Sequence, residues 1–450
     1  MKPTAAPKPI VFAAPTAQSE RIIILDSLRG IAILGILLMN IPSFGLAGDP
    51  FTNSETGINF TTWHFIKLIP DGTQRALFSM LFGAGIILFV RSAQKKTEGI
   101  QPADYFFRRQ LWLLVFSLFD VFILLWQGDI LLDYALWGMV LFTFRNLSPK
   151  ALLIAAGICL LLILARENRD FYKDKNMVAK GEAIAAIDTT QTKLTPKQKE
   201  ELGAMTSFKE KSSLEKRKER AQLNIFNTGK GDYVDLYEVR TNRYVNDLVQ
   251  YVFFEFWDVL LFMFLGMAFF KMGILTGEAP AKVYWWMLIV GLGVGIFLSY
   301  LYLQPYIKYQ NNRFEYIKNV SIQYYQLERV LRSLGLFGTI MLLYKSGIFK
   351  WLFALLRPVG QMAFTNYLMQ SILCGLFFYS VGLGMYGKLE RHQIYYVVGA
   401  VWLLQIIYSH IWLRYFRFGP FEWAWRSLTY WKVQPFIKPP KENNLQPNIA

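Results

Sequence analysis

Long apolar stretches separated by short polar segments are the dominant pattern of this chain. Because a helix needs about 20 apolar residues to cross the hydrocarbon core of a membrane, about ten of these stretches are long enough to be membrane helices. They lie at 22–46, 74–91, 108–127, 129–145, 150–166, 249–271, 283–304, 325–344, 358–380 and 395–416. Only helices and closed barrels satisfy every backbone polar group in lipid. The pattern therefore predicts an all-α, polytopic integral membrane bundle of about ten transmembrane helices.

Basic residues cluster in every second loop between these stretches. The clustered residues are Arg91, Lys95, Lys96, Arg108, Arg109, Arg145, Lys150, Lys271, Lys282, Lys345, Lys350, Arg357, Arg414, Arg417 and Arg426. Loops that are rich in Lys and Arg remain on the cytoplasmic side of a membrane. We therefore expect a multi-pass protein of the inner, or cytoplasmic, membrane with both termini in the cytoplasm.

Changes in composition divide the chain into two membrane halves, a charged insertion and two ends. Residues 1–20, rich in Ala and Pro, are expected to be a cytoplasmic tail, and 21–166 the N-terminal transmembrane half. Residues 167–248 carry mixed charges and too little apolar material for a large core, which predicts an extramembrane insertion. Residues 249–418 are the C-terminal half, and 419–450 an interfacial helix and cytoplasmic tail. The insertion is either a solvated segment or an outer cap that binds a partner.

The charge of the chain does not indicate nucleic-acid binding. The formal net charge is +16 at pH 7, but the Lys and Arg residues lie beside apolar runs, where they orient a membrane protein and contact anionic lipid headgroups. Membrane lipids are the expected partners, and no nucleic acid is expected. The two cysteines, Cys159 and Cys374, lie in different apolar runs. Neither a disulfide framework nor a thiolate metal site is indicated, so no metal is expected.

The first apolar stretch contains polar residues along one helical stripe. Asp26 and Arg29 lie one turn apart near its cytoplasmic end and are predicted to form an ion pair. Asn40 lies about three turns beyond Arg29, about 16 Å along the axis, on the same stripe. The stripe either contributes to a binding site or consists of a salt bridge at the helix end and an interhelical Asn hydrogen bond.

His64 is the histidine best placed for chemistry, because it follows the first stretch on the outer side of the membrane. An imidazole can act as a general base at neutral pH, and a neighbouring carboxylate would orient it. Asp129 and Asp133 lie one helical turn apart in GDILLDYAL, at the outer end of another stretch. The alternative interpretation makes Asp129 a helix N-cap and His64 an interfacial residue beside Trp63.

Further polar residues lie within the apolar stretches. Asn366 and Gln370 form an amide pair one turn apart in GQMAFTNYLMQSILC, and with Asp133 they are predicted to bind substrate. The alternative is that both amides hold neighbouring helices together. Asp120 and Asp258 also lie within apolar stretches, where each carboxylate needs a partner or a water-filled cavity.

Motifs in a fixed order resemble those of a known family. The segments are LDSLRGIAILGILLMNI, LFSMLFGAG, GDILLDYAL, GQMAFTNYLMQSIL and GPFEWAWRSLT. With these segments, and over nearly the whole chain outside 167–248, the sequence resembles the YeiB-like bacterial membrane proteins, an uncharacterised domain family numbered 418. The resemblance implies a helical membrane bundle, and it implies a relation to the transmembrane acyltransferases, with which this family is grouped.

That wider group has an Arg-Gly in its first helix and a catalytic His about three turns later. Arg29 matches the Arg, but Asn40 occupies the place of the His and cannot act as a base. The chain is similar in this respect to the heparan-type N-acetyltransferases, which have Asn there and a catalytic His in the following outer loop. By this resemblance, His64 is the corresponding histidine.

The leading hypothesis from the sequence is acyl transfer across the membrane. An acyl-CoA donor would bind Arg29, Arg108 and Arg109 through its phosphates. His64 would deprotonate a hydroxyl or amine of a small-molecule or glycan acceptor, with Asp129 orienting it and Asn40 as oxyanion donor. The alternative is a transporter or lipid-handling protein without catalysis, with Asn366 and Gln370 along its path. A third possibility is a sensory or scaffold role of the insertion.

Overall fold

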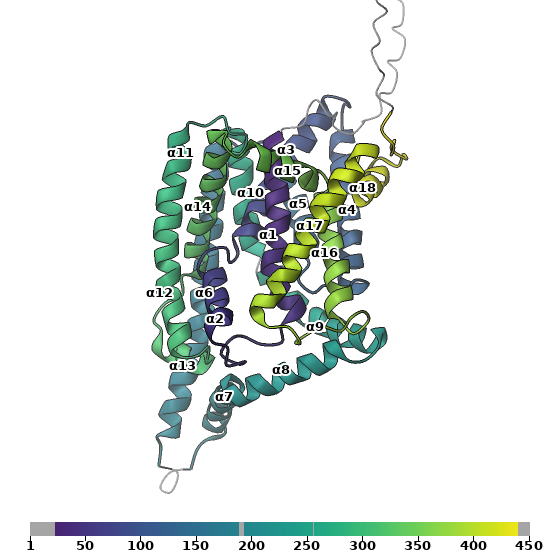
Figure 1. The fold of residues 1–450 in the computed structure, drawn as a ribbon. Helices are drawn as coiled ribbons and strands as arrows, with labels where there is room; N and C mark the ends of the chain where they lie inside the picture. The colour runs from purple at the N-terminus through teal and green to yellow at the C-terminus, as the bar shows by residue number, and fades with distance from the viewer. Residues whose placement is uncertain (1–22, 189–192, 255, 440–450) are drawn as a thin grey trace, which may run out of the picture.

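The computed structural model describes residues 23–188, 193–254 and 256–439 (Figure 1). Within these ranges every regular element is a helix, apart from an isolated antiparallel bridge between Phe416 and Ile437. The prediction of an all-α fold is therefore confirmed. The expected tail at 1–20 lies outside the described residues.

The helices follow the predicted apolar ranges, each of which overlaps at least one helix. The first part of the chain forms α1 (Ile23–Gly45), α2 (Gly57–Leu68), α3 (Thr73–Gln94), α4 (Gln101–Phe122), α5 (Leu131–Leu141), α6 (Pro149–Ala185), α7 (Pro196–Ser212), α8 (Leu214–Gly229) and α9 (Tyr233–Phe254). The second part forms α10 (Phe256–Lys271), α11 (Ala281–Trp286), α12 (Gly295–Lys308), α13 (Arg313–Asn319), α14 (Tyr325–Ser346), α15 (Lys350–Gln361), α16 (Ala363–Phe378), α17 (Arg391–Tyr415) and α18 (Pro420–Tyr430). A 3₁₀ turn, Phe142–Phe144, extends α5, and a π-helical segment, Met287–Val294, joins α11 to α12.

Five helical segments of the described chain are long and apolar enough to cross a membrane. They are Ile23–Gly45, Gly57–Gln94, Pro149–Ala185, Ala281–Lys308 and Arg391–Tyr415. The pair α14 and α15, bent by 120°, would make a sixth. The prediction of about ten transmembrane helices is thus not confirmed by length and composition. Helices α5 and α16 are short, and α4 carries Asp104, Arg108, Arg109 and Asp120 among its apolar residues.

The two ends of the bundle differ in what covers them. At one end, the start of α1 lies beside α15, and α18 packs against α4 and α16 (Figure 1). At the opposite end, α8 runs across the bundle between α7 and α9, all from the predicted insertion 167–248 (Figure 1). The start of this insertion continues α6, and Phe171 and Val178 of α6 pack with Met205 of α7 and with Phe314 and Ile317 of α13 in a small separate core. The insertion is therefore helical, and part of it packs against α13 in a small core separate from that of the bundle.

A close contact between α1 and α15 fixes the first of these two ends. A Cβ atom on Gly30 would collide with the carbonyl oxygen of Leu356, and one on Gly360 would collide with that of Asp26. Glycine at both positions lets the two backbones approach to direct contact. As a result, the polar residues near the start of α1 lie beside Gln361 at the end of α15, where the Gln361 side chain donates a hydrogen bond to Asp26 (3.3 Å).

Candidate functional site: a cavity with a cationic mouth

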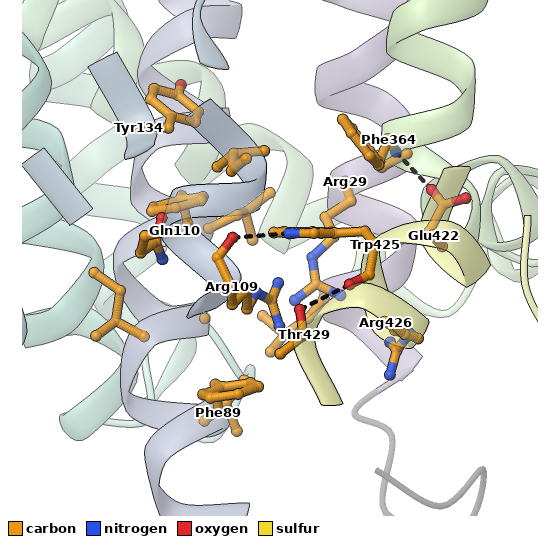
Figure 2. Close-up of a pocket in the computed structure, with 18 of the residues that line it drawn as sticks. Arg29, Phe89, Arg109, Gln110, Tyr134, Phe364, Glu422, Trp425, Arg426 and Thr429 are labelled. Atoms are coloured by element: carbon orange, nitrogen blue, oxygen red, sulfur yellow. Dashed lines mark hydrogen bonds between the residues drawn. The ribbon is translucent and has the colours of Figure 1, made fainter. Parts of the chain in front are cut away.

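A cavity of about 600 Å³ lies at the end of the bundle where α1 begins. It is enclosed by α1, α3, α4 and α5 together with the ends of α15, α16 and α18 (Figure 2). The residues around it are of two kinds, charged at one side and apolar at the other. This division makes it the best-formed candidate for a ligand site in the described part of the chain.

Positive charge predominates at the mouth of the cavity. The basic residues that line it are Arg29, Arg91, Lys95, Arg109 and Arg426. Only two acidic residues line the same cavity, Asp26 and Glu422. Arg29 donates a hydrogen bond to Asp26 (2.8 Å), which confirms the ion pair that the sequence predicts. The excess of cations over anions favours an anionic ligand.

Arg109 is held in the cavity wall by aromatic rings. Its guanidinium lies 4.1 Å from the ring centre of Trp425 and 5.0 Å from that of Phe89. The indole N–H of Trp425 donates to the backbone carbonyl of Arg109 (2.8 Å), and Figure 2 shows this bond joining α18 to α4. The same two residues therefore fix α18 to the bundle and close one side of the cavity.

Arg108 does not belong to this site, contrary to the prediction that it binds the donor with Arg29 and Arg109. Its side chain pairs with Asp104 (2.8 Å) and does not line the cavity. Successive residues of a helix point about 100° apart, so the side chain next to Arg109 faces another direction. Of the three predicted donor-binding arginines, the structure brings two together.

The inner part of the cavity is apolar and ends at two tyrosines. Phe78, Leu81, Phe82, Ile86, Leu88, Phe106 and Leu113 are among the apolar lining residues. At the far side, Tyr134 of α5 and Tyr367 of α16 line the cavity. The Tyr134 hydroxyl forms a hydrogen bond with Ser79 (2.8 Å), and the Tyr367 hydroxyl donates to Asp129 (2.9 Å).

Asp129 lies directly behind Tyr367 and accepts several hydrogen bonds. Its donors besides Tyr367 are the hydroxyl of Ser117 and the backbone N–H of Leu132 (3.1 Å). The bond from Leu132, in the first turn of α5, is the kind that a capping residue makes, as in the alternative interpretation. The N-cap residue of α5 is nevertheless Ile130, so Asp129 lies one residue before the cap, as a buried carboxylate next to the cavity floor.

His64 lies outside this site. It is half-buried on α2, a helix that lies toward the end of the bundle opposite α18 (Figure 1), and its ring lies beside those of Phe60 and Trp63. Among the described residues, no hydrogen bond joins His64 to Asp129. The expected base-and-orienter pair is therefore not formed, and the aromatic surroundings match the alternative of an interfacial histidine. Asn40, half-buried on α1, does not line the cavity either.

The residues predicted to bind substrate are engaged in helix packing instead. Asn366 donates to the carbonyl of Val359 (2.9 Å) and to Ser409 (3.2 Å), and Gln370 donates to the carbonyl of Ile33 (3.1 Å). Asp133 accepts a hydrogen bond from Arg75 (2.9 Å). None of the three predicted residues lines the cavity, so the interpretation of the two amides as interhelical contacts is the one the structure matches.

Glu422 anchors the start of α18, a helix too short to cross a membrane. Its carboxylate accepts hydrogen bonds from the backbone N–H groups of Phe364 (2.7 Å) and Thr365 (3.0 Å), the first of which is drawn in Figure 2. Burial raises the pKa of Glu422 above its ordinary value, although the hydroxyl and N–H of Thr365 act in the opposite direction. This contact joins α18 to α16 beside the cavity.

The residues that form the walls and floor of the cavity are not distinguished by their sequence pattern. Trp425, Phe89, Tyr134 and Tyr367 carry no charge, and each looks like an ordinary aromatic residue of an apolar stretch. A usable signal was the position of Tyr134 and Tyr367 inside the apolar segments GDILLDYAL and GQMAFTNYLMQSIL, because a buried tyrosine hydroxyl needs a partner.

Comparison with known proteins assigns a family to the chain. A family described as "Protein of unknown function (DUF418)" matches residues 269–432. The protein called "Uncharacterized protein YxaH" of Bacillus subtilis is 31% identical over 95% of this chain and 98% of its own length. The protein called "Uncharacterized protein YeiB" of Escherichia coli is 30% identical over 93% of this chain and 98% of its own length. No solved structure matches the chain.

Proposed function

The chain belongs to the DUF418, or YeiB-like, family, and from this premise we propose that it is an acyltransferase-like membrane enzyme whose cavity binds an acyl-CoA donor. In this proposal the protein lies in the bacterial inner membrane with both termini in the cytoplasm. The end of the bundle that contains α18 then faces the cytoplasm, where acyl-CoA is available. Arg91 and Lys95 at the end of α3 and Arg426 in α18 line the cavity at this end, which is the distribution that the positive-inside rule expects for a cytoplasmic face.

The main support for the proposal is that one cavity has both a cationic mouth and an apolar interior. An acyl-CoA has phosphates at one end and an apolar acyl chain at the other. Guanidinium groups bind phosphate oxygens through paired N–H donors, and Arg29 and Arg109 supply such groups at the mouth. The interior lined by Phe78, Phe82 and Leu113 suits an acyl chain.

Acyl transfer requires a proton acceptor near the bound thioester. The bond between the acyl carbon and sulfur breaks, a bond from the acyl carbon to the acceptor oxygen or nitrogen forms, and the acceptor loses a proton. Reacting groups must come within hydrogen-bond reach, about 3 Å. We assign the proton to Asp129, reached through the Tyr367 hydroxyl that already donates to it (2.9 Å). His64 has no role in this step, because it does not line the cavity.

A second function, lipid handling or transport without bond formation, also has an observation in its favour. The same cationic mouth and apolar interior suit an anionic phospholipid as well as an acyl-CoA. The position of His64 and Asn40 outside the cavity removes two groups on which the sequence-based mechanism depends. Binding of such an amphiphile without turnover is what this second function predicts.

The experiment compares donor binding and turnover in reconstituted protein. Labelled acetyl-CoA and a long-chain acyl-CoA are added, and bound ligand, transferred label and released CoA are measured. Arg29→Gln should weaken binding by about tenfold or more, because one charge-assisted contact is worth about 1.5–3 kcal/mol. Arg108→Gln, which changes an arginine outside the cavity, is the matched control and should bind as wild type does.

Each outcome distinguishes the proposals. Binding with CoA release that both weaken in Arg29→Gln supports acyl transfer. Binding of acyl-CoA or phospholipid with no release supports lipid handling. No binding by folded wild-type protein, or equal loss in Arg29→Gln and Arg108→Gln, contradicts the assignment of this cavity as the donor site.

A further inference from the structure

A second buried carboxylate lies next to Asp129. Asp120 of α4 is fully buried, at 0% exposure, and its side chain lies beside those of Asp129, Tyr367 and Ser371. Neither carboxylate oxygen of Asp120 has a hydrogen-bond partner among the described residues. A buried polar atom without a donor is costly for a neutral group and far more costly for an anion. The protonation state and the hydrogen-bond partner that stabilise the Asp120 side chain must therefore be inferred from the groups around it.

The two carboxylates differ in what surrounds them. Asp129 accepts hydrogen bonds from Tyr367, Ser117 and the backbone N–H of Leu132, so its negative charge has three donors. Asp120 has none, although it faces the same group of side chains. Two adjacent carboxylates in a protein interior do not both carry a charge without a cation between them.

The cations nearest to this group in the fold are already engaged. Arg240, which α9 directs into the bundle, donates to the hydroxyl of Tyr379 (2.8 Å) and to the carbonyl of Leu125 (3.4 Å). Arg75 of α3 pairs with Asp133 (2.9 Å). The tyrosines that face the pair, Tyr134, Tyr367 and Tyr379, are neutral donors or acceptors.

We propose that Asp120 and Asp129 form a carboxyl pair that binds one proton, with the proton covalently on Asp120 and shared by a hydrogen bond with Asp129. The bound proton gives Asp120 an O–H donor, gives Asp129 a fourth donor, and leaves a single negative charge on the pair. This site goes beyond the proposed function, because it does not depend on which amphiphile fills the cavity.

The site is connected to the cavity through Tyr367. The Tyr367 side chain lines the cavity, and its hydroxyl donates to Asp129 on the other side. The tyrosine therefore touches both the cavity and the carboxyl pair. A proton that arrives from the cavity bonds to the Tyr367 oxygen, while the hydroxyl proton of Tyr367, which already points at Asp129, moves to the Asp129 carboxylate.

The test is infrared spectroscopy of the full-length protein in lipid. A protonated carboxyl group absorbs as a C=O stretching band that shifts in D₂O, and an ionised carboxylate does not give this band. The wild-type protein at neutral pH should show such a band, which Asp120→Asn removes. Asp104→Asn, on the same helix but in an exposed pair with Arg108, is the matched control and should retain it.

A second variant and a salt titration test which carboxyl group carries the proton and whether a metal cation occupies the pair instead. Asp129→Asn should retain the Asp120 band but shift it, because an amide oxygen is a weaker acceptor than a carboxylate. A band that survives in Asp120→Asn and disappears in Asp129→Asn would place the proton on the wrong residue for this proposal. A wild-type band that Na⁺ or K⁺ abolishes would make the pair a metal-cation site and overturn the proton assignment, as would the absence of any band assignable to this pair.

Discussion

Trp425 is expected to be the residue that holds α18 over the cavity. Its ring stacks against the guanidinium of Arg109 at 4.1 Å, its indole N–H donates to the Arg109 carbonyl at 2.8 Å, and its ring lies 5.2 Å from that of Phe364. The substitution Trp425→Ala removes all of these contacts together. It leaves the backbone of α18 and the anchor at Glu422 in place.

The magnitude follows from the separate contacts. A cation–π contact contributes about 1 kcal/mol, a hydrogen bond about 1 kcal/mol, and an aromatic pair about 0.5–1.5 kcal/mol. Their sum, about 3 kcal/mol, corresponds to an increase of about 100-fold in the local opening equilibrium of α18. Trp425→Phe keeps the ring contacts and loses only the N–H donor, so it should increase opening by about fivefold.

Hydrogen exchange of the α18 backbone amides in lipid nanodiscs measures this opening directly. The control is Trp431→Ala, because Trp431 follows the same helix and its side chain is 75% exposed. We expect fast exchange along α18 in Trp425→Ala, intermediate exchange in Trp425→Phe, and wild-type exchange in Trp431→Ala. If Trp425→Ala and Trp431→Ala exchange alike, Trp425 does not clamp α18 and the cavity wall is held by other contacts.

Two further predictions concern the same end of the bundle. The folded-state pKa of Glu422 is raised by burial, so its contribution to stability is present at low pH and is lost as pH rises through that pKa. The melting temperature of wild type should therefore fall more steeply with rising pH than that of Glu422→Gln, and equal slopes would contradict the burial argument. Gly360→Ala should lower stability by about 1–3 kcal/mol in denaturant titration, because its Cβ meets the Asp26 carbonyl. Gly85→Ala is the control, because a Cβ there meets nothing within 4 Å. If both variants lose the same stability, the backbones of α1 and α15 move apart to accommodate the added Cβ at little cost.

The hydrophobic pattern was sufficient to locate the helices but not to count membrane crossings. Every predicted apolar range overlaps a helix, because the apolar periodicity and the local helix propensity agree. Span number depends on which helices reach both surfaces, and here α14 and α15 are bent by 120° while α5 and α16 are short. Whether a helix reaches both surfaces is determined by how the helices pack together, so it cannot be inferred from the sequence of one segment.

The candidate site was predictable only where the evidence was local. The pair of Asp26 and Arg29 follows from helical spacing alone, and the structure has it at 2.8 Å. The difference between Arg108 and Arg109 depends on which face of α4 meets α18, a contact between segments far apart in the sequence. The role of Asn366 depends in the same way on Val359 and Ser409, which tertiary packing brings to it.

The geometry also decides where chemistry in this cavity can be catalysed. Arg29 at the mouth and Asn40 on the same helix are separated by about three turns, about 16 Å, and His64 lies beyond α1 on α2. Because His64 does not line the cavity, an acyl-CoA whose acyl group occupies the cavity does not place its thioester beside His64. Tyr367 is at the cavity floor and donates to Asp129, so any proton released during a reaction there reaches the carboxyl pair first. In the proposed mechanism, chemistry at the cavity floor and protonation of the Asp120–Asp129 pair are coupled through Tyr367. Tyr367→Phe is expected to leave ligand binding intact and to slow proton exchange between the cavity and the pair.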